Sequence, residues 1–175
     1  MKLLVFDTSP VSGFTMAGEL DLLETVTQGY QCVMTMEVAR ELEAGAERLP
    51  VLKDVFSAEW LEIVSDQSIE YFSLFAGNSE QLLGRDDRNL GECSTIAYAE
   101  HHGGVAVLDD QTALNFAIRR KVVTSRSLWL LVNALERNFI SEQELVRAVD
   151  GLVGVGVYLP FKSGASFLRE VRSQR

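Results

Sequence analysis

Acidic side chains follow two of the apolar runs that we expect to form strands. The run Lys2–Phe6 leads directly into Asp7, and the run Gly104–Leu108 leads into Asp109 and Asp110. Because strand-like and helix-like segments alternate along this chain, we expect a parallel sheet whose strands end at one common edge. The sequence therefore predicts three carboxylates close together at that edge, where they could bind a divalent cation.

Two further acids lie on expected helices. Glu92 recurs with Ile96 and Ala99 at positions i, i+4 and i+7, so its side chain should point inward. A buried carboxylate without a partner is costly, so such a residue needs a cation, a hydrogen-bonding partner or a helix N-terminus. Glu41 borders the apolar stripe that contains Val38, and it can reach the rim of the core, although a Glu on an amphipathic helix usually lies at the surface.

Each of these acids also has a purely structural interpretation. Asp7, or the neighbouring Ser9, could cap a helix that begins there, and Asp109 or Asp110 could cap the helix that follows the second run. Glu92 in a first helical turn would compensate the helix dipole. Capping explains either strand end taken alone better than metal binding does. Their coincidence at one sheet edge favours a metal site.

Carboxylates that converge on one pocket repel one another, which raises their pKa values unless a hard divalent cation lies among them. Ligation by oxygen alone favours Mg²⁺ or Mn²⁺ over Zn²⁺. A metal in such a site can activate water and stabilise displacement at phosphorus, as in phosphodiester cleavage. His101 and His102 follow a helix end beside Gly103, where they favour the helix dipole, and we assign them no role.

The elements that must position the acids alternate between two periodicities. Strands are expected at Lys2–Phe6, Tyr30–Thr35, Trp60–Val64, Gly104–Leu108, Lys121–Thr124 and Val155–Leu159. Helices are expected at Asp21–Thr27, Met36–Ala44, Ser68–Leu83, Leu90–His101, Thr112–Arg120, Leu128–Asn138, Glu142–Leu152 and Ala165–Arg172. This alternation predicts an α/β fold with a mainly parallel central sheet and helices on both faces, in a single domain of residues 1–175.

Composition narrows the class of protein. The chain has 175 residues, 47% of them hydrophobic, so it can bury a sizeable core without disulfides or a structural metal. Cys32 and Cys93 stand alone in apolar patterns and are expected to be reduced core thiols. The apolar run at the N-terminus is too short for a signal peptide or a membrane span, so we expect a cytoplasmic protein. Glycine-rich phosphate-binding loops are absent from the sequence.

Charge is distributed unevenly along the chain. The net charge is −9, but residues 1–110 carry 20 acids against 6 Lys and Arg, whereas residues 111–175 carry 5 acids against 10 Lys and Arg. An acidic part could hold divalent cations and a basic part could meet a polyanion. On charge alone, solvated faces of unequal sign are the better explanation.

Four motifs, in this order and at this spacing, resemble the PIN domain, and in particular its bacterial and archaeal branch that includes VapC-type toxins. They are strand-Asp-Thr-Ser at Asp7 to Ser9, Val-x-x-Glu-Leu at Val38 to Leu42, Gly-Glu-x-x-x-Ile-Ala-x-Ala at Gly91 to Ala99 and Leu-Asp-Asp at Leu108 to Asp110. The resemblance covers nearly the whole chain. Each motif is weak by itself, and the four in order are considerably more specific.

The resemblance implies both a site and an activity. The four acids of the family fall on Asp7, Glu41, Glu92 and either Asp109 or Asp110, and its hydroxyl residue near the first acid falls on Thr8 or Ser9. It further implies a ribonuclease dependent on Mg²⁺ or Mn²⁺, and often a toxin restrained by an antitoxin protein. The alternative is a PIN-like module with weak or absent activity that binds nucleic acid or protein.

This chain departs from the family pattern in two ways. Many members carry Thr-x-Asp at the fourth position, whereas this chain has Leu108 followed by two Asp residues. Basic residues are also scarce near the motifs, so RNA contacts would fall mostly to Arg119, Arg120, Lys121 and Arg126, which could equally be surface charges. Asp86 and Asp87 could support the metal ligands or simply be loop acids.

An apolar helical face offers a possible contact between subunits. The face comprises Leu128, Leu131, Val132 and Leu135. It could serve a homodimer, which we expect for this protein, although a place in the internal core is the more common use of such a face.

Overall fold

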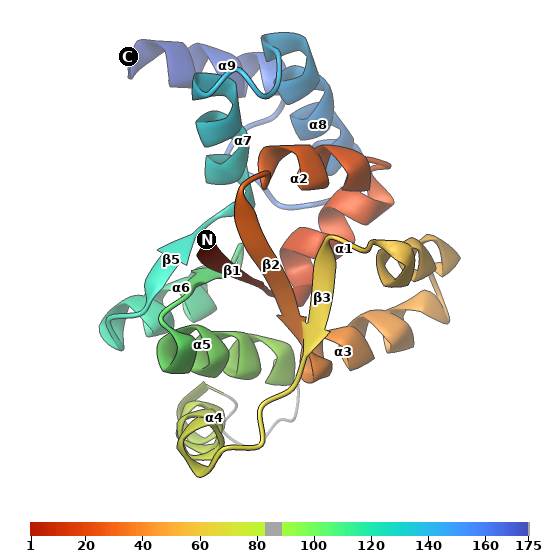
Figure 1. Cartoon of the computed structure of the whole chain (residues 1–175). Coiled ribbons are helices and arrows are strands. Elements are labelled where there is room, and N and C mark those ends of the chain that lie inside the picture. The colour runs from red at the N-terminus through yellow and green to blue at the C-terminus, as the bar shows by residue number, and fades with distance from the viewer. Residues whose placement is uncertain (83–88, 175) are drawn as a thin grey trace.

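A computed structural model of the chain describes residues 1–82 and 89–174 and contains a central sheet of five parallel strands. Their order across the sheet is β3-β2-β1-β4-β5 (Figure 1). The strands are β1 (Lys2–Phe6), β2 (Tyr30–Thr35), β3 (Leu61–Val64), β4 (Val105–Val107) and β5 (Val123–Ser125). The strand β1 lies at the centre of the sheet and pairs with β2 on one side and β4 on the other. Asp7, which follows β1, therefore lies between the ends of two neighbouring strands.

Helices connect successive strands and cover both faces of the sheet (Figure 1). They are α1 (Thr8–Met16), α2 (Leu20–Val26), α3 (Met36–Ala46), the 3₁₀ helix η1 (Pro50–Ser57), α4 (Ile69–Leu82), α5 (Leu90–His102), α6 (Gln111–Arg119), α7 (Ser127–Glu136), α8 (Glu142–Gly154) and α9 (Gly164–Ser173). The expected α/β fold with helices on both faces of a parallel sheet is confirmed.

Alternating side chains of the strands divide the core into two clusters. Leu4 and Phe6 of β1 pack with α1, α2, α3, α7 and α8 on one face of the sheet. Val5 points the other way and packs with α5 and α6, which include Ile96 and Phe116. Since side chains in a strand alternate between faces, one strand contributes to both clusters. The buried second half of β1, Leu4 to Phe6, thereby anchors Asp7, the residue that follows it.

The expected strand at Val155–Leu159 is wrong. Val155 is the C-cap of α8, and the chain then passes through Gly156, whose φ of 86° lies in the left-handed region. The segment that follows forms no strand and runs to the start of α9. A short apolar run does not by itself distinguish a strand from other conformations, and none of the strands in the described part of the chain pairs with this segment.

Two of the described elements were absent from the expected list, and β3, β4 and β5 begin one or two residues later than expected. Asp7 and Pro10 start α1, which was considered only as an alternative to a metal site, and Pro50 starts η1. Lys121 has a φ of 63°, so it belongs to the turn before β5 and not to the strand. Gly103 ends α5, as expected for a helix end at this position, and adopts the left-handed conformation, with a φ of 68°.

The apolar face of α7 is part of the core. Leu128, Leu131, Val132 and Leu135 are all buried within the chain, at 9% exposure or less. This face is therefore used internally and does not supply a contact between subunits, while a homodimer formed in another way stays a prediction. Among the described residues, no helix combines the length and the apolar character needed to cross a bilayer.

Candidate functional site

Asp7 lies at the carboxyl end of the central strand and is almost completely buried, with 1% of its surface exposed. Its backbone N–H donates to the carbonyl of Val107 at 3.2 Å, which ties the end of β1 to the end of β4. Its Oδ2 accepts the N–H of Ser9 at 3.4 Å and so caps α1. Its Oδ1 is buried and has no hydrogen-bond partner among the described residues. Capping therefore uses one oxygen and leaves the other for a further ligand.

Burial changes the acidity of Asp7. The pKa of the Asp7 carboxyl is raised from 3.8 to about 7, chiefly by burial and also by the negative charges of Glu41 and Asp109, against backbone hydrogen bonds from Thr8 and Ser9 that lower it. The influence of Glu41 and Asp109 shows that these carboxylates face the same region. Asp7 is thus a buried acid at which the surroundings disfavour negative charge.

Glu41 joins three helices by hydrogen bonds. Its Oε1 accepts the N–H of Gly91 at 2.7 Å, and its Oε2 accepts a short hydrogen bond from the hydroxyl of Thr8. These contacts hold α3 against the first turns of α1 and α5. A Cβ on Gly91 would lie 2.6 Å from Oε2 of Glu41, so only glycine allows this approach. Of the two candidate hydroxyl residues, Thr8 contacts an acid through its side chain, while Ser9 does so through its backbone.

Glu92 is half-buried in the first turn of α5. The pKa of its carboxyl is raised from 4.5 to about 8, chiefly by burial and then by the charges of Asp7, Asp110 and Glu41. Its inward orientation, predicted from the helical spacing, brings it among the other acids. Like charges at this range disfavour full ionisation unless a cation is present.

Buried hydroxyls hold α5 in place. The Thr35 and Ser94 hydroxyls are 2.7 Å apart, and the Ser94 hydroxyl donates to the carbonyl of Gly91 at 2.8 Å. Thr95 donates to the carbonyl of Phe6 at 3.4 Å. Glu92 is therefore carried by a helix that is bonded to the ends of both β1 and β2.

Asp109 and Asp110 have different surroundings. Both oxygens of Asp109 accept hydrogen bonds from Ser127, at 2.9 Å from its N–H and 2.7 Å from its hydroxyl. Burial raises the pKa of Asp109, although the Ser127 hydrogen bonds oppose it. Oδ1 of Asp110 caps α6 through the N–H groups of Thr112 and Ala113. The charge of Asp109 acts on Asp7 and that of Asp110 acts on Glu92, so both acids adjoin the site.

The five acids, Asp7, Glu41, Glu92, Asp109 and Asp110, influence one another's pKa values through their charges but are not in close contact. In the described part of the chain, they form no group of three whose oxygens all lie within 4.8 Å of one another. An oxygen-only donor set, the raised carboxyl pKa values of Asp7, Glu92 and Asp109, and the unpartnered Oδ1 of Asp7 together fit a hard divalent cation such as Mg²⁺ or Mn²⁺. Asp7, Glu92 and the Asp109/Asp110 pair are the residues that would hold it.

Of the basic residues expected to contact RNA, Arg126 lies at the acids, whereas Arg119 and Arg120 do not. Arg119 and Arg120 end α6, about 13 Å along the helix from the acidic cap at Asp110. Arg120 makes a bidentate ion pair with Glu100, at 2.8 and 3.0 Å, so its charge is already paired within the fold. Arg126, the fourth expected basic residue, does reach the site, because its guanidinium donates to the carbonyl of Asp109 at 3.3 Å.

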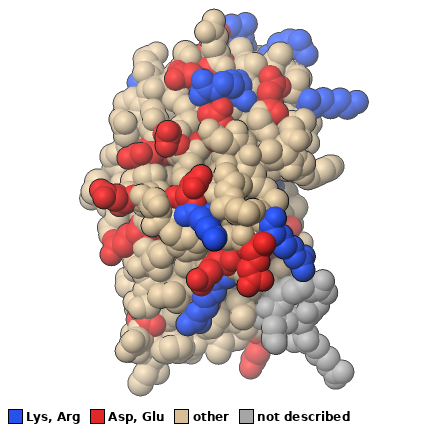
Figure 2. Space-filling model, turned by 90° about the vertical axis from the view of Figure 1, so that its right-hand side faces the viewer, with Lys and Arg blue, Asp and Glu red and all other residues tan. Residues whose placement is uncertain are grey.

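Surface charges are mixed on the side that carries β3, α3 and η1. Figure 2 shows Lys and Arg side chains among Asp and Glu side chains there, and the described residues form no continuous basic patch on that face. A nucleic-acid backbone would gain little electrostatic binding energy from this face. This face is therefore a poor binding surface for nucleic acid.

A cleft of about 890 Å³ adjoins the acidic site. Ser9, Asp109 and Arg126 line it together with the aromatic residues Trp129 of α7 and Tyr158 of the segment before α9. Trp129 is 59% exposed and Tyr158 is 96% exposed, so their rings are available to a ligand. The segment misread as a strand thus forms one wall of this cleft.

Sequence reasoning missed Ser127 and the importance of Gly91. Ser127 follows β5 by two residues, so the rule that located Asp7 and Asp109, polar residues just after a strand, would also have located it. Gly91 was noted only as part of a motif. Its role, to leave room for the carboxylate of Glu41, depends on another helix and could not be inferred from the sequence. Asp86 and Asp87, named above as loop acids, lie outside the described residues.

Binding of Mn²⁺ at this site is expected to weaken as the pH falls from 8 to 6. Asp7 and Glu92, with pKa values of about 7 and about 8, take up protons in this range and must release them when a cation binds. Titration calorimetry in two buffers of different ionisation enthalpy should show up to two protons released at pH 6 and fewer at pH 8. An affinity that does not change between these pH values would contradict the raised pKa values.

Comparison with known proteins supports the assignment suggested by the motifs. A family model described as a PIN domain matches residues 3–173, nearly the whole chain. No curated protein matches the chain. A match of this extent, together with the parallel sheet that gathers acids at its central edge, is decisive for the family. The chain belongs to the PIN-domain family.

Proposed function

We propose that this protein is a ribonuclease of the cytoplasm that depends on Mg²⁺ or Mn²⁺. PIN domains are generally nucleases, and one observation in this chain carries the proposal: a buried carboxylate oxygen of Asp7 without a partner, among acids whose pKa values are raised. When bound, the metal supplies a polarised water and stabilises negative charge at phosphorus. The chain supplies the ligands and the surroundings that exclude bulk water from Asp7.

Individual residues have distinct tasks in this proposal. Asp7, Glu92 and the Asp109/Asp110 pair bind the cation, and Ser127 orients Asp109. Glu41, held by Thr8 and Gly91, lies behind them and adds negative charge to the site. Arg126 is placed to contact a phosphate of the substrate next to the acids.

Single-stranded RNA is the substrate that the cleft favours. Trp129 and Tyr158 expose aromatic rings in the cleft that also contains Asp109 and Arg126. Unpaired bases stack on such rings whatever their sequence, whereas bases in a duplex are already stacked on one another. The substrate would thus be recognised through stacking near the acids, with little help from general basic charge.

A cleavage assay tests the proposal. Metal-stripped protein is incubated with labelled single-stranded RNA, double-stranded RNA and single-stranded DNA, in the presence of Mn²⁺, Mg²⁺ or a chelator. We expect metal-dependent cleavage of single-stranded RNA that Glu92→Gln abolishes and Glu43→Gln preserves, since Glu43 is an exposed acid on α3. If wild type binds no Mn²⁺ and cleaves nothing, the catalytically inactive binding module becomes the better description.

Trp129→Ala is expected to weaken RNA binding by roughly 5- to 150-fold, the equivalent of the ~1–3 kcal/mol that stacking of one base contributes. The effect should appear in KM with Mn²⁺ affinity unchanged, because Trp129 lines the cleft but contributes no metal ligand. Phe56→Ala is the matched control, since Phe56 is an exposed aromatic residue on η1. Equal losses in the two variants would remove the cleft from the proposal.

A toxin role with an antitoxin partner remains a proposal drawn from the family resemblance. Induction of the wild-type chain should arrest growth of a host cell, and induction of Asp7→Asn at the same level should not. Growth arrest by both forms would separate toxicity from the acidic site.

A further inference from the structure

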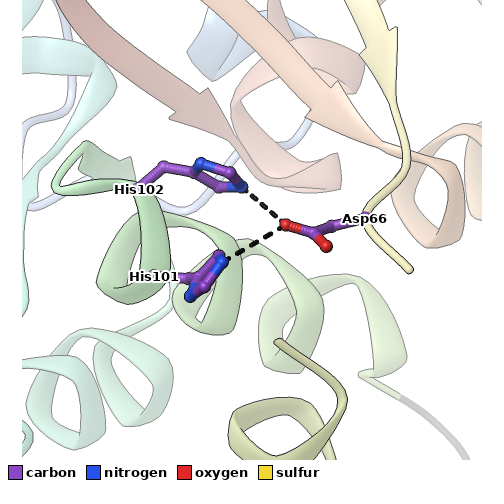
Figure 3. A group of neighbouring side chains, drawn as sticks. All are labelled: Asp66, His101 and His102. Carbon is purple, nitrogen blue, oxygen red and sulfur yellow. Dashed lines mark hydrogen bonds and ion pairs between the residues drawn. The ribbon is translucent and has the colours of Figure 1, made fainter. Parts of the chain in front are cut away.

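A second group of possible metal ligands lies outside the acidic site. His101 and His102 end α5, and Asp66 lies in the segment between β3 and α4. Figure 3 shows both imidazole rings directed at the same carboxylate oxygen. Nε2 of His102 lies 2.8 Å from Oδ2 of Asp66, and Nε2 of His101 lies 3.5 Å from it. The three ligand atoms all lie within 4.8 Å of one another.

The three side chains are held in place by their surroundings. The N–H of Ser68 donates to Oδ1 of Asp66 at 2.7 Å, so Oδ2 is the oxygen left to face the histidines. The ring of Tyr98 lies 4.2 Å from the ring of His102, measured between centroids. The two histidine rings are 4.7 Å apart and nearly perpendicular. Neighbouring helical residues normally point about 100° apart, so this convergence on one oxygen is specific to the fold.

The spacing fits a tetrahedral metal ion. Zn²⁺ binds His nitrogen and carboxylate oxygen at about 2.0–2.2 Å, so two ligand atoms of a tetrahedral site lie roughly 3.4 Å apart. The measured separations of 2.8 and 3.5 Å lie on either side of that value. Entry of the metal requires the ring protons to reside on Nδ1 and only small movements of the side chains.

The local charge also favours a cation. The C-terminal end of a helix carries partial negative charge, and both histidines lie in the last turn of α5. The negative charge of Glu62 acts on Tyr98, whose ring packs against His102, so one more acid lies near this group. Among the residues that the structure describes, this is the group of acid and histidine side chains that comes close enough to share one ion.

We propose that Asp66, His101 and His102 form a Zn²⁺ site with three protein ligands and a water molecule as the fourth. Imidazole nitrogens select Zn²⁺ over Mg²⁺, which distinguishes this site from the oxygen-only acidic site. The two sites are separate, because His102 lies about 15 Å along α5 from Glu92. The side chains are 13%, 26% and 37% exposed for Asp66, His101 and His102, which leaves one side open to solvent for the fourth ligand.

The zinc ion would stabilise the structure. It would join the segment between β3 and α4 to the end of α5, two parts of the chain that are 35 residues apart. Since α5 also carries Glu92 in its first turn, the ion would hold the helix that presents an acidic ligand. This inference does not depend on nuclease activity and can be tested by metal binding alone.

Cobalt and zinc binding test the proposal on the full chain. Metal-stripped protein titrated with Co²⁺ should develop the visible absorption of a tetrahedral ion, and Zn²⁺ should displace it at one equivalent per chain. His102→Gln and Asp66→Asn should each lower the Zn²⁺ affinity at least tenfold, whereas Asp54→Asn, at an exposed acid on η1, should not. Zn²⁺ should raise Tm of the wild type by several degrees and leave Tm of His102→Gln unchanged.

Binding of Mn²⁺ at the acidic site serves as an internal control for folding. His102→Gln should bind Mn²⁺ as wild type does, which shows that a loss of Zn²⁺ affinity is local. Unchanged Zn²⁺ affinity in His102→Gln, or Co²⁺ absorption typical of octahedral oxygen ligation, would overturn the proposal and leave an ordinary Asp–His ion pair. Loss of cleavage without loss of the Co²⁺ spectrum would concern the nuclease proposal alone.

Discussion

Replacing Asp7 by Asn is expected to stabilise the metal-free protein at pH 8 and to abolish metal-dependent cleavage. The pKa of Asp7 is about 7 in the folded protein against 3.8 as the ordinary value, so the folded state binds this proton more tightly than the unfolded state does. The free energy of unfolding therefore falls as the pH rises from about 4 to about 7, and the full penalty is present at pH 8. A shift of this size corresponds to at most about 4 kcal/mol.

The variant removes that penalty because Asn is neutral at every pH. Asn also caps helices as well as Asp does, so the contact with the N–H of Ser9 can be kept. Urea denaturation in the presence of a chelator should show a large gain for Asp7→Asn at pH 8 and a clearly smaller gain at pH 5, where Asp7 is protonated in the folded protein but already ionised in the unfolded chain. Asp54→Asn, at an exposed position, should show no such dependence on pH.

Activity should move in the opposite direction. Loss of a carboxylate that binds the cation should lower kcat/KM by more than the roughly 10- to 100-fold that removal of an outer partner of a metal ligand causes. Saturating Mn²⁺ should stabilise the wild type and not the variant. If Asp7→Asn is destabilised equally at pH 5 and pH 8, Asp7 is a structural cap and its burial has no connection with a cation.

Gly91→Ala is expected to impair both stability and cleavage through Glu41. The new Cβ would lie 2.6 Å from Oε2 and 2.9 Å from Cδ of Glu41, so the carboxylate must move away from Thr8 and from the first turn of α5. Overpacking of this kind costs about 1–3 kcal/mol. We expect at least a tenfold loss of cleavage, since the same turn carries Glu92.

Gly77→Ala is the matched control for this change. Gly77 lies within α4, and a Cβ there would meet nothing within 4 Å. Alanine is preferred to glycine in a helix by about 1 kcal/mol, so this variant should be slightly more stable than wild type. Glu41→Ala provides a second control, because the cost of Gly91→Ala should largely disappear in that background. A cost that persists there would assign the clash to another neighbour.

Elements with strong local signals could be predicted from the sequence. The bounds of β1 and β2 match the expected strands, because buried parallel strands appear as continuous apolar runs. The expected strand at Val155–Leu159 failed because an apolar run by itself shows neither burial nor pairing: Val155 and Tyr158 are exposed, and the segment pairs with none of the described strands. Whether a segment pairs depends on a neighbouring strand, which is a property of the whole sheet.

The residues of the candidate site likewise differ in how far local sequence patterns could locate them. Asp7, Asp109 and Asp110 were located by their place after strands, and Glu92 by helical spacing, since both arguments use only local periodicity. The roles of Arg119 and Arg120 could not be judged in this way, because α6 carries them away from the acids and Glu100 pairs with Arg120. Sequence position did not reveal which basic residue reaches the site.

By itself, the sequence determined the alternation of strands and helices, and with it the sheet edge at which the acids collect. Periodicity and apolar runs are local, so these features need no knowledge of distant contacts. The tertiary structure decided the burial of Asp7, the approach of Glu41 to Gly91 and the meeting of Asp66 with His101 and His102. Each of these depends on residues far apart in the chain, whose packing sets the local charge, solvent exposure and pKa values.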